Sequence, residues 1–208
     1  LGGSLVTSWL SRPGWRSPFQ GLVDECVAGP GEGPLLSMLG AAPVRDAAIP
    51  EYGVFPRPAY LSPGFVLPYS ASRGCYWRSC TFCPEKAERN PYRPTPSGRV
   101  MEDLRLLQAG TKPVLLHFLD SAMSPSLLRS LAGERVGVPW YGFARVSAEL
   151  ADPEFCVALR RSGCVMLKLG IESGSQRVLD RLQKGLNLET ASKTLDALKT
   201  AGIAAYVY

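Results

Sequence analysis

The chain has 208 residues, of which 46% are hydrophobic and 20% charged, and its net charge is +5. This composition is typical of a soluble globular protein, and no apolar run approaches the roughly 20 residues that a membrane-spanning helix needs. The basic residues are scattered rather than arranged in a stripe, so the sequence predicts neither a membrane protein nor a nucleic-acid-binding protein.

The start of the chain, Leu-Gly-Gly-Ser, lacks the basic and apolar regions of a signal peptide. We therefore expect a cytoplasmic protein. The chain begins without methionine, and its last residues, "IAAYVY", form an apolar run that nothing terminates. Both ends favour an internal fragment of a longer protein.

Residues 1–40 alternate apolar stretches with glycine-rich turns, a pattern that suggests α/β units. Residues 41–64 contain five prolines and little periodicity, which is typical of a linker. We therefore expect a short α/β piece, then a linker, and a third region that starts at residue 65.

From residue 65 onward, apolar stretches alternate with amphipathic ones. The predicted strands lie within 65–71, 113–121, 139–146, 165–173 and 203–208, and the predicted helices within 99–109, 124–133, 152–163, 175–185 and 187–202. Two helices have clear start signals, Ser124 followed by Pro125 and Asp152 followed by Pro153. Gly110, Gly133 and Gly163 are the expected stops.

Strands and helices that alternate at this spacing predict parallel βαβ units with right-handed crossovers. The predicted fold class is α/β: part of a parallel β/α barrel over residues 65–208, with an open doubly wound sheet as the alternative. In such a barrel the chemistry gathers where the strands end, on the loops that lead into the helices.

Three cysteines lie close together in "GCYWRSCTFC", with the spacing Cys75-x4-Cys80-x2-Cys83. This loop follows the first predicted strand, on the face where the chemistry is expected. Thiolates suit zinc or iron–sulfur clusters. Cys26, Cys156 and Cys164 stand among apolar neighbours, and we expect them to be buried, inert thiols.

A closed zinc site or an electron-transfer cluster needs four ligands, and no fourth cysteine lies nearby. The single histidine, His117, lies within a predicted strand, where we expect it to face the helices while Asp120 points into the barrel mouth. We therefore interpret the missing ligand as a vacancy that leaves one iron of a cubane cluster open to a small molecule.

This cysteine loop resembles that of the radical S-adenosylmethionine (radical SAM) enzymes, whose usual spacing is Cys-x3-Cys-x2-Cys. The longer spacing resembles the subgroup with a cobalamin-binding-type domain ahead of the barrel. "LKLGIESGSQRVLDRLQKG", "HFLDSAM" and "YGFARVS" resemble later strands of the same family. By this comparison, residues 1–40 are the end of the cobalamin-binding-like domain, 41–64 the linker and 65–208 the first part of the barrel.

The resemblance implies an enzyme that holds a [4Fe-4S] cluster through Cys75, Cys80 and Cys83. The cluster would cleave S-adenosylmethionine reductively, and the 5′-deoxyadenosyl radical would abstract hydrogen from a small-molecule or peptide substrate. An electron donor such as flavodoxin or ferredoxin is implied as partner. Cobalamin-dependent methyl transfer and peptide modification both fit the subgroup; any cobalamin would be bound by the upstream domain.

The resemblance also implies contacts to S-adenosylmethionine, and no catalytic residue beyond the cofactor ligands. Phe82 matches the aromatic residue near the adenine, Asp120 a group that receives the methionine amino end, and Arg145 a partner for the carboxylate. Glu172 and Ser173 end the fourth strand, where polar groups meet the ribose or the methionine. For each residue a packing contact, a salt bridge or a helix cap is the alternative.

A different class of function stays open from the residues alone. The three cysteines could stabilise a loop in a non-catalytic iron–sulfur or zinc protein, or the barrel could serve as a binding scaffold. Metal content and cleavage of S-adenosylmethionine separate these alternatives.

Overall fold

The computed structural model describes residues 1–42, 49–55, 61–87 and 91–208. The chain divides into two compact units: residues 1–50 with 82–90, and residues 51–81 with 91–208. The predicted linker, 41–64, falls partly outside the described residues, at 43–48 and 56–60.

The described residues of the first unit form three short helices: α1 (Ser4–Leu10), α2 (Glu32–Met38) and α3 (Pro84–Ala87). The α/β pattern expected for residues 1–40 is not what the structure has, because the only strand-like pairing described there is an isolated bridge between Gln20 and Val23. The apolar stretch at the start forms α1 instead. That these residues end a cobalamin-binding-like domain stays a prediction.

The second unit is built on a parallel sheet with the strand order β1-β4-β5-β6-β7. These strands are β1 (Val66–Tyr69), β4 (Leu115–Phe118), β5 (Trp140–Ala144), β6 (Cys164–Leu169) and β7 (Ala204–Val207). Each new strand is added beside the previous one, so the order never reverses as it does in a doubly wound sheet. The prediction of a partial parallel β/α barrel is confirmed.

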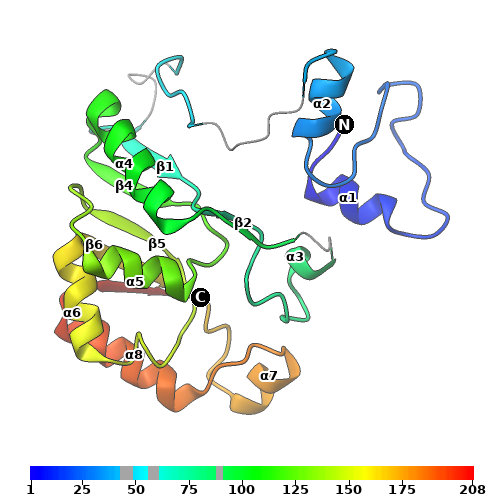
Figure 1. The fold of residues 1–208 in the computed structure, drawn as a ribbon. Coiled ribbons are helices and arrows are strands. Elements are labelled where there is room, and N and C mark those ends of the chain that lie inside the picture. Colours follow the sequence, from blue (N-terminus) through cyan, green and yellow to red (C-terminus); the bar gives the residue numbers. More distant parts are fainter. Residues whose placement is uncertain (43–48, 56–60, 88–90) are drawn as a thin grey trace. The chain divides into compact units, whose positions relative to one another are not determined.

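Helices connect the strands and lie together on one side of the sheet (Figure 1). They are α4 (Ser97–Thr111), α5 (Pro125–Gly133), α6 (Pro153–Ser162) and α8 (Leu188–Thr200), with the short α7 (Gln176–Arg181) before α8. The strand residues facing this layer form the core, and Leu116, Phe118, Trp140 and Leu167 are fully buried. Burial of such a side chain contributes about 1.5–3 kcal/mol to the free energy of unfolding, so these residues stabilise the packing of the helices on the sheet.

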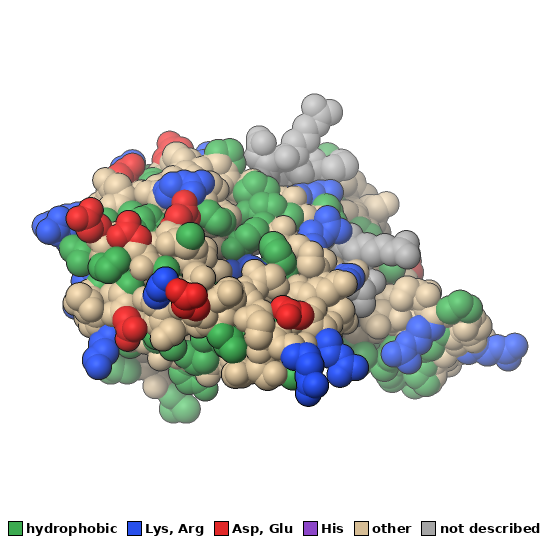
Figure 2. All heavy atoms as spheres, turned by 90° about the horizontal axis from the view of Figure 1, so that it is seen from below, with side chains coloured by type: hydrophobic (Ala, Val, Ile, Leu, Met, Phe, Trp, Pro, Cys, Tyr) green, Lys and Arg blue, Asp and Glu red, His purple; other side chains and the backbone are tan. Residues whose placement is uncertain are grey.

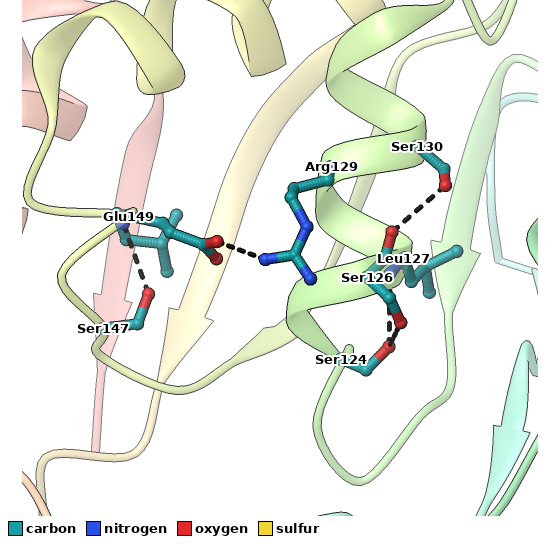
Figure 3. Close-up of polar contacts among 8 residues, drawn as sticks. Ser124, Ser126, Leu127, Arg129, Ser130, Ser147 and Glu149 are labelled. Atoms are coloured by element: carbon teal, nitrogen blue, oxygen red, sulfur yellow. Dashed lines mark hydrogen bonds and ion pairs between the residues drawn. The ribbon is translucent and has the colours of Figure 1, made fainter.

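The predicted helix starts are confirmed at two positions. The Ser124 hydroxyl accepts a hydrogen bond from the Leu127 amide at 3.2 Å, and the Asp152 carboxylate accepts one from the Glu154 amide at 2.9 Å. Figure 3 shows the first of these caps, together with an ion pair from Arg129 of α5 to Glu149 in the segment after β5. A lost cap of this kind costs about 1 kcal/mol.

The predicted helix ends are correct only in part. Gly163 follows α6 with a left-handed φ of 113°, as predicted. Gly133 is instead the last residue of α5, and α4 continues past Gly110 to Thr111. The left-handed position after α4 is taken by Lys112, at φ 47°, so the chain places a lysine where glycine is the usual residue.

A small antiparallel pair, β2 (Ser72–Arg73) with β3 (Arg93–Pro94), follows the first strand of the parallel sheet. Among the residues that the structure describes, no helix is both long and apolar enough to cross a membrane. On the face seen in Figure 2, acidic and basic side chains are interspersed over much of the surface.

Candidate active site

The cysteine loop begins at the carboxyl end of β1, where the sequence placed it. Gly74 has a left-handed φ of 72°, and a Cβ there would lie 3.0 Å from the carbonyl oxygen of Pro91. The chain can turn into the loop at this point because glycine tolerates both the conformation and the close approach. The loop that follows carries Cys75 and Cys80 within the second unit, and Cys83 comes three residues after Cys80.

Asp120 binds the start of this loop. Its carboxylate accepts a hydrogen bond from the Ala71 amide at 3.0 Å and another from the Ser72 hydroxyl, and only 2% of the residue is exposed. Burial raises the pKa of this carboxyl, and these hydrogen bonds oppose the rise. Asp120 therefore positions the loop, and its predicted contact with the methionine amino group stays a prediction.

Trp77 docks the middle of the loop onto the segment after α7. Its indole Nε1 donates to the Gln183 carbonyl at 3.1 Å, and the Arg145 guanidinium lies 4.2 Å from the indole ring centroid. The Thr81 amide adds a hydrogen bond to the Leu182 carbonyl at 3.0 Å. Trp77, between Cys75 and Cys80, and Thr81, next to Cys80, are thereby bonded to a segment about a hundred residues later.

Gly185 makes this docking possible. A Cβ at Gly185 would lie 1.9 Å from the Trp77 ring, and the residue has a left-handed φ of 62°. No other residue fits without displacing the indole. The predicted helical stretch ran to residue 185, but α7 ends earlier, at Arg181, and Gly185 leaves room for the Trp77 ring.

Arg145 and Glu172, predicted from two different strand ends, both contact Lys184. The Arg145 guanidinium donates to the Lys184 carbonyl, and the Lys184 ammonium lies 3.0 Å from the Glu172 carboxylate. Lys184 is 8% exposed as a side chain, whereas Glu172 is 29% exposed. The structure therefore brings these two predicted residues together through a lysine that the sequence analysis missed, because nothing in the pattern around it signals a buried cation.

Glu172 also has an unusual backbone. Its φ is 72°, in the left-handed region that favours glycine, and its amide donates to the Tyr208 carbonyl at 2.7 Å. A non-glycine residue held in this conformation costs about 1–3 kcal/mol, and such strain is concentrated at functional sites. The conformation and the Lys184 ion pair together fix where the Glu172 carboxylate lies.

Ser173 and Phe82 have simpler surroundings. The Ser173 hydroxyl accepts a hydrogen bond from the Ser175 amide at 3.1 Å, which closes a turn ahead of α7. Ser175 precedes that helix, but its side chain makes no capping hydrogen bond. Phe82 is 52% exposed and belongs to the first unit. Contacts of either residue with S-adenosylmethionine stay predictions.

The three loop cysteines are free thiols. Cys80 is buried, and Cys75 and Cys83 are half-buried. Cys75 and Cys80 belong to the second unit and Cys83 to the first. Within the described ranges, no group of three or more His, Cys, Asp or Glu side chains is close enough together to hold a metal ion, so the three-thiolate site rests on the donor chemistry of the loop.

The other cysteines of the second unit are enclosed in its core. Cys156 and Cys164 are fully buried, as predicted, and donate to the carbonyl oxygens of Leu150 and Met166. Burial raises the pKa of Cys156 to about 11 and raises that of Cys164 as well. Both thiols are thus enclosed by the core and hydrogen-bonded to the backbone, as expected of structural cysteines. Cys26 was predicted to be buried, but it is half-buried.

The prediction for His117 is wrong in its direction. Trp140 faces the helices, since its Nε1 donates to Ser162 of α6 at 3.2 Å, and Leu116 is its register partner on β4. Leu116 and Phe118 therefore face the helices, and His117, between them, faces the opposite side. There it stacks on Tyr141, with ring centroids 4.2 Å apart.

With the fold and the loop described, comparison with known proteins gives the family. The model of the radical SAM superfamily matches residues 69–208. The chain belongs to the radical SAM superfamily. The match covers the cysteine loop and every strand of the parallel sheet except the first residues of β1.

Two curated relatives support this membership. The chain is 29% identical over 170 residues to an uncharacterized methyltransferase of Pyrococcus horikoshii, covering 76% of this chain and 35% of the relative. It is 25% identical over 193 residues to the anaerobic magnesium-protoporphyrin IX monomethyl ester cyclase of Rubrivivax gelatinosus, covering 85% and 32%. The chain thus spans about a third of the length of these relatives.

Solved structures share the fold. The radical S-adenosylmethionine methyltransferase TsrM from Kitasatospora setae, solved with cobalamin and a [4Fe-4S] cluster, matches with a TM-score of 0.58 and 21% identity, covering 69% of this chain and 30% of TsrM. The cobalamin-dependent radical enzyme OxsB matches with a TM-score of 0.56 and 22% identity, covering 68% and 23%. At this identity the similarity shows the fold alone.

Proposed function

We propose that this protein is a radical SAM enzyme that holds a [4Fe-4S] cluster through Cys75, Cys80 and Cys83 and binds S-adenosylmethionine beside it. The observation that carries the proposal is the position of the cysteine loop at the carboxyl edge of the parallel sheet, within the residues that match the superfamily. Cys156 and Cys164 are fully buried and donate to backbone carbonyls, so the loop cysteines are the donors that we assign to the cluster.

When bound, such a cluster supplies the electron that breaks a carbon–sulfur bond of S-adenosylmethionine. The role of the chain's own residues is to hold the loop and to orient the cofactor. Asp120 fixes the beginning of the loop, and Trp77 with Arg145 fixes its middle. These contacts come from rigid strand ends, which reduces the number of positions that the first two thiols can take.

Arg145 and Glu172 are suited to bind polar groups of S-adenosylmethionine. Arginine has five N–H donors, so the hydrogen bond to the Lys184 carbonyl leaves donors that can bind a carboxylate. Glu172 uses one carboxylate oxygen for Lys184, and its other oxygen can accept from an ammonium or from ribose hydroxyls. Ser173 follows at the same strand end as a further polar contact.

The reaction class that we propose is based on the reactions named for the relatives. A methyltransferase and a cyclase are among the proteins that the chain resembles, and TsrM and OxsB bind cobalamin. We propose a small-molecule or peptide substrate, with methyl transfer as the first reaction to assay and a low-potential protein such as flavodoxin or ferredoxin as electron donor. Cobalamin binding is proposed for the region upstream of the barrel.

Anaerobic reconstitution of the full-length protein tests the proposal. We expect about four irons per chain, brown absorbance, and cleavage of S-adenosylmethionine after chemical reduction. Replacing Cys75, Cys80 or Cys83 with Ala removes all three signals, whereas replacing Cys156 or Cys164 keeps them. A colourless protein with one bound zinc, or loss of iron in Cys156→Ala, would sink the proposal.

A further inference from the structure

The side of the sheet opposite the helices presents a row of aromatic residues. His117 pairs in register with Tyr141, Phe143 with Lys168, and Lys168 with Tyr206. Side chains of register partners point to the same face of a sheet, so these five lie on one surface that crosses four strands. Together with Tyr208, which directly follows β7, we call it the aromatic face.

The rings of the aromatic face contact one another. His117 stacks on Tyr141, Phe143 stacks on Tyr208 with centroids 5.2 Å apart, and Tyr208 contacts Tyr206 at 4.9 Å. These ring contacts give the aromatic face the kind of aromatic lining that small-molecule sites commonly have.

Lys168 places one fixed positive charge within these rings. Its ammonium lies 5.1 Å from the Tyr141 centroid and 5.4 Å from the Phe143 centroid. Within the described ranges, no carboxylate is within ion-pair distance of it. The neighbouring His117 adds no charge at neutral pH, since burial, and then Lys168, lower its pKa. The aromatic face is therefore positively charged, and none of the described residues supplies a counter-ion for Lys168.

These features define the chemistry of a ligand. Ring surfaces favour a flat ring that stacks or packs edge-on, and ligand sites are commonly apolar surfaces with a few charged groups that fix orientation. A cation already held over aromatic rings repels a cationic ligand and attracts an anionic one. Phe143 and Lys168 are each the last residue but one of their strands, so a ligand here would lie next to the edge from which the cysteine loop starts.

We propose that the aromatic face binds a planar organic anion, a ring that carries a carboxylate, with Lys168 as its counter-ion. That this ligand is the substrate rests on the radical SAM function proposed above; the binding itself does not. A carboxylate next to Lys168 completes an ion pair that the described chain lacks, while Tyr141, Phe143 and Tyr206 supply the ring contacts.

Two matched probes test the charge requirement: 2-naphthoate, and the neutral 2-naphthalenemethanol with the same ring system. Calorimetric titration of the full-length protein should show the carboxylate binding roughly tenfold more tightly than the alcohol, as one charge-assisted contact allows. Higher salt should weaken the binding of 2-naphthoate and leave the binding of the alcohol unchanged. Lys168→Met should remove the preference without removing the binding of the alcohol, and Tyr141→Ala should weaken both probes.

Lys193→Met is the control, because Lys193 is an exposed lysine on α8 that pairs with Glu189. It should keep the full preference for 2-naphthoate. If Lys168→Met does not fold, Lys168→Gln serves the same purpose. Equal affinity for the two probes in the unmodified protein, or an unchanged preference in both Lys168 variants, overturns the proposal.

The outcome for the proposed function is measured separately. Iron content and reductive cleavage of S-adenosylmethionine without substrate are measured in the unmodified protein and in Lys193→Met, and the two should be the same. An unmodified protein that binds no iron but prefers 2-naphthoate refutes the radical SAM function and leaves the anion site standing. A protein that binds iron but shows no preference between the probes refutes only the anion site.

Discussion

Replacing Gly185 with Ala should loosen the cysteine loop without unfolding the sheet. A Cβ at this position would lie 1.9 Å from one atom of the Trp77 ring and 2.3 Å from another. The indole must therefore move, and it then loses its hydrogen bond to the Gln183 carbonyl and its contact with Arg145. The substitution acts on the loop that carries Cys75 and Cys80 through a residue more than a hundred positions away.

The expected loss can be added up from these contacts. A hydrogen bond contributes about 1 kcal/mol and a half-exposed cation–π contact about 0.5–1 kcal/mol, so the docking of Trp77 is worth roughly 2 kcal/mol. The left-handed backbone adds about 1–2 kcal/mol of strain for any residue other than glycine. Gly202→Ala isolates that strain, since Gly202 has a similar φ of 69° and its Cβ would meet nothing nearer than 3.9 Å.

Hydrogen exchange of the Thr81 amide, which binds the Leu182 carbonyl, gives a direct measurement. We expect this amide to exchange about 30-fold faster in Gly185→Ala than in Gly202→Ala, which is what roughly 2 kcal/mol of local opening implies. Iron retained after reconstitution should fall in Gly185→Ala and stay unchanged in Gly202→Ala. Equal exchange of Thr81 in the two variants would show that Trp77 does not hold the loop.

Three further predictions concern single side chains. Burial raises the pKa of Asp120 above its ordinary 3.8, so the folded state binds a proton more readily than the unfolded state. The stability of the fold should therefore fall as the pH rises from about 3.8 through the raised pKa. Asp120→Asn should flatten this part of a profile of melting temperature against pH. A profile that rises over this interval would contradict it. Glu172→Ala should weaken binding of S-adenosylmethionine tenfold to a hundredfold in equilibrium dialysis, with iron content unchanged, whereas Ala at the exposed Glu189 should have no effect. Lys112→Gly should stabilise the protein by about 0.5–1 kcal/mol in chemical denaturation, because Lys112 holds a left-handed φ of 47°; a lower midpoint would refute the assignment of strain.

The sequence predicted the local elements of the second unit well because their signals are local. Ser124 and Asp152 each precede a proline that opens a helix, and each accepts the expected backbone hydrogen bond. Gly163 ends its helix for the same kind of reason. The order of the strands followed from their alternation with helices, since right-handed crossovers leave few arrangements for consecutive parallel strands.

The partners of the site residues could not be predicted, because they come from distant parts of the chain. Nothing near Trp77 indicates that its indole will lie against Gly185, and nothing near Lys184 indicates that it will be buried beside Glu172. The α/β pattern expected for residues 1–40 failed for a related reason. Short apolar stretches between glycines are compatible with strands and with helices, and the rest of the fold decides between them.

The error over His117 comes from a property of parallel sheets, and it shows how their two sides can be told apart. Both faces of a strand in a barrel are covered, so both are apolar and alternation alone does not say which face meets the helices. In "LLHF" and "MLKL" the apolar pattern is interrupted once, at His117 and at Lys168. A polar side chain is costly against a helix layer packed with leucine, since it finds no partner there, and it is tolerated where rings or ligands can meet it. The two interruptions therefore mark the side away from the helices, and both residues lie on the aromatic face.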